Sequence, residues 1–339
     1  MSVTRDLQLD GYRGIVMIYI VCVIHVVNWL DYNIEPYNSF MLFEMPIIFF
    51  ISGASLTFSG DKNFWQNLNN RLWRILVPYY IYAIVSIILL TLGSILTTYN
   101  FELSKYSLGN IGRVVFALDI PQSPFLAHIW FIIPYLLVLC SFPFQKYAIR
   151  KMGGGVKYIT VNIIVFIIIL LSEIRSGILR EVLCYNIFLL IGFCYYKNLK
   201  TKTTVLFAII FSIVTLSLCG FKDFVPMNGH KFPPDFLFFS YGMMMLCVVS
   251  ILFSRIKIKT NKIIELWNKR GYTIYLYQNI VYFVFVEVCK SVGISMPANL
   301  LGFLISVISI FSLSTLFSFI FYPLETHIIR RVRKQFIKI

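Results

Sequence analysis

The sequence predicts an all-α fold: a polytopic transmembrane bundle of about ten helices. Of its 339 residues, 58% are hydrophobic and only 13% are charged, and the mean hydropathy is +0.78. A soluble domain is typically about 45–50% apolar and about 25% charged. The apolar residues stand in long runs that can cross about 30 Å of hydrocarbon, and the basic residues collect between those runs.

Ten apolar runs are expected to cross the membrane. The fifth and sixth are the shortest, and without that pair the count is eight. We expect one domain over residues 1–339, and the first run lacks the small-residue cleavage site of a signal peptide. The expected spans cover residues 12–30, 40–59, 75–96, 127–144, 157–172, 182–197, 203–220, 235–256, 272–291 and 299–322.

The basic residues predict the orientation of these spans. Of the 30 Lys and Arg residues, 22 lie in the two tails and in every second connection, and seven lie in the other connections. Lys and Arg accumulate on the cytoplasmic side of a membrane protein, so both termini are expected in the cytoplasm, with the chain in the cell (plasma or inner) membrane. The basic residues that orient the chain in the lipid bilayer thereby account for much of its net charge of +15. The sequence contains no motif for binding nucleic acid.

The sequence argues against several common kinds of site. All seven cysteines lie in apolar runs and none forms a CxxC pair, which predicts neither disulfides nor zinc binding. The chain also lacks GxSxG, HExxH, Walker and EF-hand motifs. We therefore expect no metal and no active site of a familiar soluble-enzyme type.

An arginine and a histidine interrupt the first apolar run, LDGYRGIVMIYIVCVIH. Arg13 is expected at the cytoplasmic end, and His25 lies about 18 Å further along, in the outer half of the bilayer, at 1.5 Å per residue. Glu44 lies about one turn inside the outer end of the second span, and a short connection makes these two helices antiparallel neighbours. We therefore expect His25 and Glu44 at nearly the same depth and close enough to touch.

A carboxylate beside an imidazole fixes its tautomer and raises its basicity, as a general base requires. His25 and Glu44 are therefore the candidate catalytic residues. The alternative is that the two polar groups only satisfy each other inside the bundle. Ionisable residues at this depth are costly and mark functional sites, which favours the catalytic interpretation.

The fourth and ninth spans also carry polar residues. His128 and Trp130 open the fourth span at the outer face and are the candidate substrate-binding residues, although an interfacial tryptophan is commonly an anchor. Gln278 and Asn279 lie in the inner half of the ninth span, where we expect hydrogen bonds between helices.

Arg71 and Arg74 lie in the connection after the second span. Most such charges only follow the topology rule. Together with Arg13, however, they are candidates for an anion site on the cytoplasmic side, because guanidinium groups bind phosphate well.

Six segments resemble, in order, motifs of the acyltransferase-3 family of integral membrane proteins. LDGYRGIVMIYIVCVIH resembles the first-helix signature of the family, and EMPIIFFISGASL followed by NRLWRILVPYYIY is similar to its second helix, basic loop and third helix. The segments HIWFIIPYLLVL, GYTIYLYQ and YPLETHIIRR resemble its later motifs. Each motif is loose alone, but their order is fairly specific, and the resemblance covers nearly the whole chain.

The resemblance implies transfer of an acyl group, often acetyl, from cytoplasmic acetyl-CoA or another acyl-CoA to a hydroxyl of a cell-surface or lipid-linked carbohydrate. His25 would be the catalytic base, Arg13 would serve the donor, and Arg71 and Arg74 would help to hold the CoA phosphates. Gln278 stands where the family often has a histidine, so we expect no acid–base role there. Some family members resemble export components, so the alternative function is a membrane exporter of a polysaccharide or lipid-linked glycan.

One spacing departs from the family pattern. The family usually has ten residues between the basic residue and the histidine, whereas eleven separate Arg13 from His25. An α-helix turns by about 100° per residue. With the usual spacing the two side chains therefore point in directions about 20° apart, and with one more residue between them the angle grows to about 120°. Either Arg13 precedes the regular helix, or a π-bulge absorbs the extra residue, or the two side chains serve different surfaces.

Overall fold

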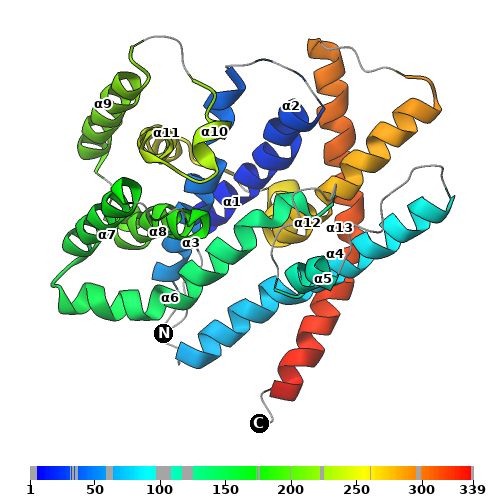
Figure 1. Cartoon of the computed structure of the whole chain (residues 1–339), viewed down its shortest axis with the longest axis horizontal. Coiled ribbons are helices and arrows are strands. Elements are labelled where there is room, and N and C mark those ends of the chain that lie inside the picture. Colours follow the sequence, from blue (N-terminus) through cyan, green and yellow to red (C-terminus); the bar gives the residue numbers. More distant parts are fainter. Residues whose placement is uncertain are drawn as a thin grey trace. The chain divides into compact units, whose positions relative to one another are not determined.

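The computed structural model describes most of the chain, and the described part consists almost entirely of helices, with no strand (Figure 1). This confirms the predicted all-α class. The described residues are 6–30, 32, 34, 37–58, 64–96, 108–116, 125–172, 174, 176–198, 200–221, 225–259, 261–294 and 299–336. Some of the basic residues used for the orientation lie outside them: Arg5, Lys62, Lys105, Arg175, Lys222 and Lys338.

The described elements follow one another along the chain as labelled in Figure 1. Their bounds are α1 Leu7–Tyr19, the π-helix η1 Ile20–Ile24, α2 His25–Trp29, the 3-10 helix η2 Tyr37–Met41, α3 Glu44–Thr57, α4 Phe64–Leu96, α5 Leu108–Val115, the 3-10 helix η4 Ala127–Phe131, α6 Ile132–Lys151, α7 Gly155–Leu171, α8 Gly177–Tyr195, the 3-10 helix η5 Tyr196–Asn198, α9 Thr201–Leu218, α10 Asn228–Lys231, α11 Phe236–Arg255, α12 Lys262–Ser291 and α13 Leu300–Phe336.

Eight helical segments of the described chain are long and apolar enough to cross a membrane. They coincide with eight of the ten predicted spans, and the chain is therefore a polytopic helical membrane protein. The other two predicted spans are helical as well: residues 157–172 fall on α7, which has 17 residues, and residues 272–291 fall in α12. That these two cross the bilayer stays a prediction, as does the orientation of all ten.

The sequence predicted that Arg71 and Arg74 lie in a connecting loop. They lie instead inside α4, which begins at Phe64. The apolar run predicted only the part of this helix that hydrocarbon can cover. A helix satisfies its own backbone hydrogen bonds, so nothing forces it to end where the apolar residues end. The same holds for α13, which runs on through the basic residues from Arg330 to Arg333.

The contacts between helices divide the chain into two compact units. The first comprises Met1–Lys62 and Leu137–Asn268, and the second comprises Asn63–Leu136 and Lys269–Ile339. The prediction of a single domain concerns the chain as a whole and stays a prediction.

Two glycines bring α3 and α8 into close contact in the first unit. A Cβ atom on Gly53 would lie 1.9 Å from the backbone oxygen of Leu189, and one on Gly192 would lie 2.0 Å from that of Phe50. Small residues at helix interfaces let backbones approach in membranes, where dispersion contacts replace the hydrophobic effect as the main attraction. This crossing fixes the helix that begins with Glu44.

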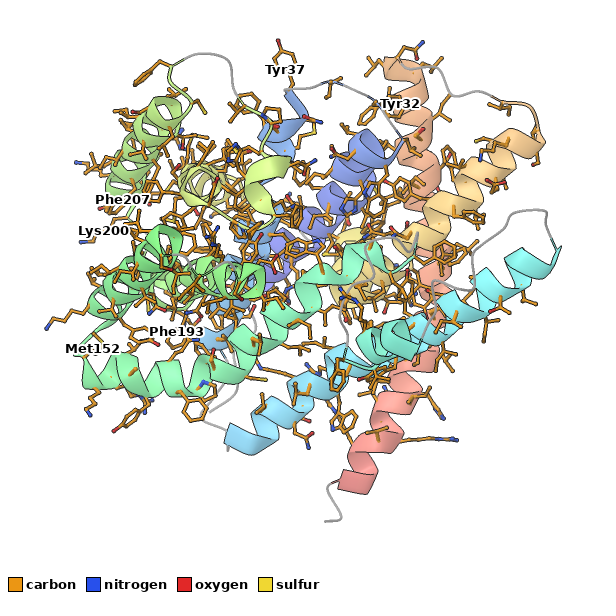
Figure 2. All side chains as sticks on the ribbon, viewed as in Figure 1. Tyr32, Tyr37, Met152, Phe193, Lys200 and Phe207 are labelled. Carbon is orange, nitrogen blue, oxygen red and sulfur yellow. The ribbon has the colours of Figure 1, made fainter. Side chains whose placement is uncertain are left out.

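The other helices of the first unit pack around this pair. α1 packs on α3, and its Tyr12 stacks on Phe253 of α11 with ring centroids 4.0 Å apart. α9 lies along α11 (Figure 1) and leaves most of its own side chains exposed. Figure 2 shows Phe207 of this helix, and Lys200 directly before it, on the left of the view. An exposed apolar helix of this kind is suited to contact with lipid.

In the second unit α13 packs along α4. Tyr272 of α12 donates a hydrogen bond to the carbonyl of Ile75 in α4 at 3.1 Å. Tyr277, one turn further on, stacks on Phe321 of α13 with ring centroids 3.9 Å apart. α12 is thereby held against both long helices of this unit.

The glycine crossing predicts that Gly53→Ala destabilises the protein. The added methyl group would overlap the backbone of α8, and overpacking of this kind costs about 1–3 kcal/mol. We expect a lower midpoint of thermal unfolding for the purified protein, followed by intrinsic fluorescence. Gly112→Ala is the control, because a Cβ atom there meets nothing within 4 Å; equal midpoints for the two variants would contradict the proposed role of the crossing.

Candidate functional site

Arg13 is held by side chains from three helices of the first unit. Its guanidinium donates hydrogen bonds to the hydroxyl of Ser55 on α3, to Oδ1 of Asn268 on α12 at 3.2 Å, and to Oδ1 of Asp10, one turn back on α1, at 3.3 Å. The side chain remains 36% exposed. The arrangement fixes the position of a cation but leaves it accessible to an anionic ligand.

A π-helical turn lies between Arg13 and His25. The turn covers Ile20–Ile24 and continues without a break from α1 into α2. A π-bulge takes up one residue more than a regular helical turn. The twelve residue-to-residue steps from Arg13 to His25 therefore rotate about as far as eleven steps of an α-helix. Arg13 and His25 consequently lie on about the same face of one rod.

This observation decides between the three explanations of the unusual spacing. Arg13 lies within α1, which begins at Leu7, so the explanation that it precedes the regular helix is wrong. The π-bulge is confirmed, and the two side chains need not serve different surfaces.

His25 is the first residue after the π-helical turn and is half-buried. Its ring stacks on the indole of Trp29, one helical turn further on, with centroids 4.1 Å apart and planes 4° from parallel. Stacking of this kind fixes the plane of the imidazole. π-bulges are often found at functional sites, and this one sets the direction in which His25 leaves the helix.

Glu44, the first residue of α3, is buried and forms an ion pair that the sequence did not predict. Its Oε1 accepts a hydrogen bond from Nζ of Lys231 at the end of α10, and both side chains are almost completely buried. The second carboxylate oxygen, Oε2, has no hydrogen-bond partner among the described residues. The expected contact between His25 and Glu44 stays a prediction.

Lys231 carried one signal that could have drawn attention to it. It is one of only seven basic residues on the predicted outer side of the membrane. A lysine placed against the topology rule needs a local reason, and its pairing with Glu44 supplies one.

The connection that carries Lys231 also contains a histidine with a carboxylate partner. Nδ1 of His230 lies 2.6 Å from Oδ2 of Asp235. The other carboxylate oxygen of Asp235 accepts the backbone N–H of Phe238 at 2.9 Å and so caps α11. Sequence reasoning missed this pair, because His230 lies in a connection and Asp235 stands at the very start of the predicted span 235–256.

His128, in the second unit, is buried and has both ring nitrogens engaged. Nε2 lies 3.2 Å from the carbonyl oxygen of Leu276, and Nδ1 lies 2.9 Å from the side-chain nitrogen of Asn279. A carbonyl can only accept, so Nε2 carries the proton and Nδ1 accepts from Asn279. These bonds give His128 a structural role between η4 and α12, and its predicted contact with substrate stays a prediction.

Two further predictions concern the neighbours of His128. Trp130 is half-buried beside Phe131, with ring centroids 6.5 Å apart, and its role in substrate binding stays a prediction. Asn279 makes the hydrogen bond between helical segments that its position predicted, which is confirmed by its contact with His128.

The second unit also contains a carboxyl group that the sequence analysis did not assign. Glu325 of α13 is buried and accepts a hydrogen bond from the hydroxyl of Thr273 at 2.5 Å, while its Oε1 has no hydrogen-bond partner among the described residues. The described part of the chain has no group of three or more His, Cys, Asp or Glu residues that could hold a metal ion.

Arg71 and Arg74 belong to a basic region formed by α4 and α13. Arg74 is exposed and lies within electrostatic range of Arg333, which donates a hydrogen bond to the carbonyl of Asn70 at 2.7 Å. A region that carries several guanidinium groups favours an anion. Arg13 lies in the first unit and Arg71 and Arg74 in the second, so a joint site for all three stays a prediction.

A comparison with protein families gives one match. The family model described as an acyltransferase domain, that of the acyltransferase-3 family, covers residues 6–323. No curated protein and no solved structure matches the chain.

The contacts of His128 predict that Asn279→Leu destabilises the protein. The substitution leaves the buried Nδ1 of His128 without this donor, at a cost of about 1–3 kcal/mol. We expect a lower midpoint of thermal unfolding for the purified protein. Asn198→Leu makes the same chemical change at an exposed position in η5 and should unfold near the wild-type temperature; an unchanged midpoint for Asn279→Leu would show that the hydrogen bond does not stabilise the fold.

Proposed function

The chain belongs to the acyltransferase-3 family and is a membrane acyltransferase, and from this premise we propose its reaction. It moves an acyl group, with acetyl as the first candidate, from cytoplasmic acyl-CoA to a hydroxyl of a cell-surface or lipid-linked carbohydrate. The protein acts in the cell membrane, plasma or inner, with the lipid bilayer as its surroundings.

The observation that carries this proposal is the single face that Arg13 and His25 share on the helix from Leu7 to Trp29. The π-helical turn gives a cation and a histidine the same direction, about 18 Å apart along the rod at 1.5 Å per residue. A donor with a phosphate-bearing head and a long pantetheine arm can use both residues. Its head group binds near Arg13, and its thioester reaches toward His25.

In this mechanism His25 is the general base. Its imidazole removes the proton of the acceptor hydroxyl, whose oxygen attacks the carbonyl carbon of the thioester. The new C–O ester bond forms, the C–S bond breaks, and CoA leaves as the thiol after taking up the proton. Because acceptor and donor are held together, the transfer is direct and requires no covalent enzyme intermediate.

We propose that basic residues hold the donor. Arg13 is partly exposed, and Arg71 and Arg74 lie on the basic region of α4 and α13. These residues would bind the phosphates of CoA through charge-assisted hydrogen bonds. The donor supplies the activated acyl group, and the protein supplies binding, orientation and the base.

The first test is His25→Ala. We expect surface acylation to be lost while the amount of protein in the membrane stays normal, because removal of a general base typically costs about 100- to 10,000-fold in rate. The measurement is transfer from labelled acetyl-CoA to a panel of glycans by the purified protein, read by mass spectrometry, together with immunoblotting of membranes.

His230→Ala is the comparison, because this histidine has a carboxylate partner of its own. Normal acylation in His25→Ala would contradict the proposal, and loss in His230→Ala alone would move the base to that residue. If deletion of the gene removed the surface polymer and left its acyl content unchanged, the result would support an exporter instead.

The π-helical turn predicts the outcome of a deletion. Removing Val23 leaves ten residues between Arg13 and His25, and a regular α-helix then keeps both on about the same face. We expect this variant to retain measurable acyl transfer. Inserting an alanine after Val23 shifts His25 by about 100° and should abolish transfer; the reverse order of activities would contradict the shared face.

A further inference from the structure

We propose that the buried pair of Glu44 and Lys231 forms a subsite for a hydroxyl group of the acceptor, in which Glu44 binds the hydroxyl and Lys231 is the positioning residue. The inference rests on the proposed function for the class of acceptor, a carbohydrate. It adds a residue that no sequence motif marks, and it gives Glu44 a partner other than His25.

The first evidence is the uneven environment of the Glu44 carboxylate. Glu44 is only 4% exposed and Lys231 only 5%. Lys231 donates to Oε1, whereas Oε2 is buried without a hydrogen-bond partner among the described residues. Buried polar atoms are nearly always hydrogen-bonded, so an oxygen of this kind is suited to accept a hydrogen bond from a ligand.

The second evidence is that the connection carrying Lys231 is firmly held. The backbone N–H of Met227 donates to the hydroxyl of Ser39 on η2 at 2.9 Å, and both residues are buried. Asp235 closes the other end of the connection by capping α11. Lys231 therefore reaches Glu44 from a stretch of backbone, residues 227–235, that is held at both ends.

The electrostatics of the pair select the kind of ligand. The ammonium of Lys231 offsets the charge of Glu44, so the pair attracts a cation only weakly, and an anion would be repelled by the carboxylate. A neutral hydroxyl can donate to Oε2 without any change of net charge. Tyr19, Tyr185 and Tyr241 lie within electrostatic range of Glu44, so its surroundings include side chains that are apolar except for a hydroxyl group.

A purely structural ion pair would not explain this arrangement. Buried pairs are often no more stabilising than apolar residues of the same volume, because desolvation offsets the attraction. A buried polar atom without a hydrogen-bond partner is costly, and among the described residues Oε2 of Glu44 is one of these atoms. The unpaired Oε2 therefore favours a binding role.

The kinetic test uses Lys231→Met and Lys231→Arg. Lys231→Met removes the charge while keeping a long side chain, and we expect KM for the acceptor to rise about 10- to 100-fold, the equivalent of one charged hydrogen bond, with KM for acetyl-CoA unchanged. Lys231→Arg should recover most of the loss. Lys290→Met is the matched control, because Lys290 pairs with Glu287 at an exposed position.

The second test measures binding alone and does not depend on acyl transfer. Methyl glycosides of glucose, galactose, mannose and N-acetylglucosamine are added to the protein in lipid nanodiscs, and binding is detected by saturation-transfer NMR. Nanodiscs replace maltoside detergents, which carry sugars of their own. We expect binding to the wild type and to Lys290→Met and its loss in Glu44→Gln.

A double variant separates binding from folding. Removing one partner of a buried pair leaves the other charge uncompensated and destabilises the fold, whereas removing both is far less harmful. We therefore expect Glu44→Leu/Lys231→Met, which replaces both partners by apolar residues, to unfold near the wild-type temperature but to bind no glycoside. Glycoside binding by this double variant, or none by the wild type, would overturn the inference; absence of acyl transfer by a wild type that binds glycosides would overturn only the proposed function.

Discussion

The hydrocarbon of a bilayer offers no water to a polar group, and this constraint governs the arrangement of the polar side chains in this protein. Every ionisable residue inside the apolar part must find a partner from the chain or from a ligand. Arg13 finds three partners, and His128 has both ring nitrogens engaged. Glu44 has a partner for one of its two oxygens. Glu325 likewise has a partner among the described residues for only one of its oxygens, and these incomplete cases are the informative ones, because the constraint itself makes them costly.

The sequence was sufficient to predict the helices but not the partners of their polar residues. Apolar runs and basic connections predict which segments span and roughly how deep a residue lies. Depth alone does not say which side of a helix a residue occupies, and this is why the ion pair of Glu44 with Lys231 was not predicted. Lys231 lies in a connection, where neither periodicity nor hydropathy gives a signal.

Helix ends were predicted less well for a related reason. Hydropathy reports where hydrocarbon ends, whereas the helix ends where its backbone hydrogen bonds end. In α4 these two boundaries differ by almost three turns, and the residues between them include Arg71 and Arg74. Placing both arginines on a helix gives them a regular spacing and a rigid support. A loop would have given neither.

The π-helical turn shows how a local irregularity preserves a functional relation. An extra residue in a regular helix would turn His25 away from Arg13 by about 100°. The helix absorbs it within Ile20–Ile24 and resumes α-helical geometry at His25 itself. Because one continuous helix carries both residues, backbone hydrogen bonds fix their separation and relative direction. In the mechanism that we propose, a donor anchor and a base acting on one thioester would benefit from such a connection, since a small misplacement of reacting groups costs a large factor in rate.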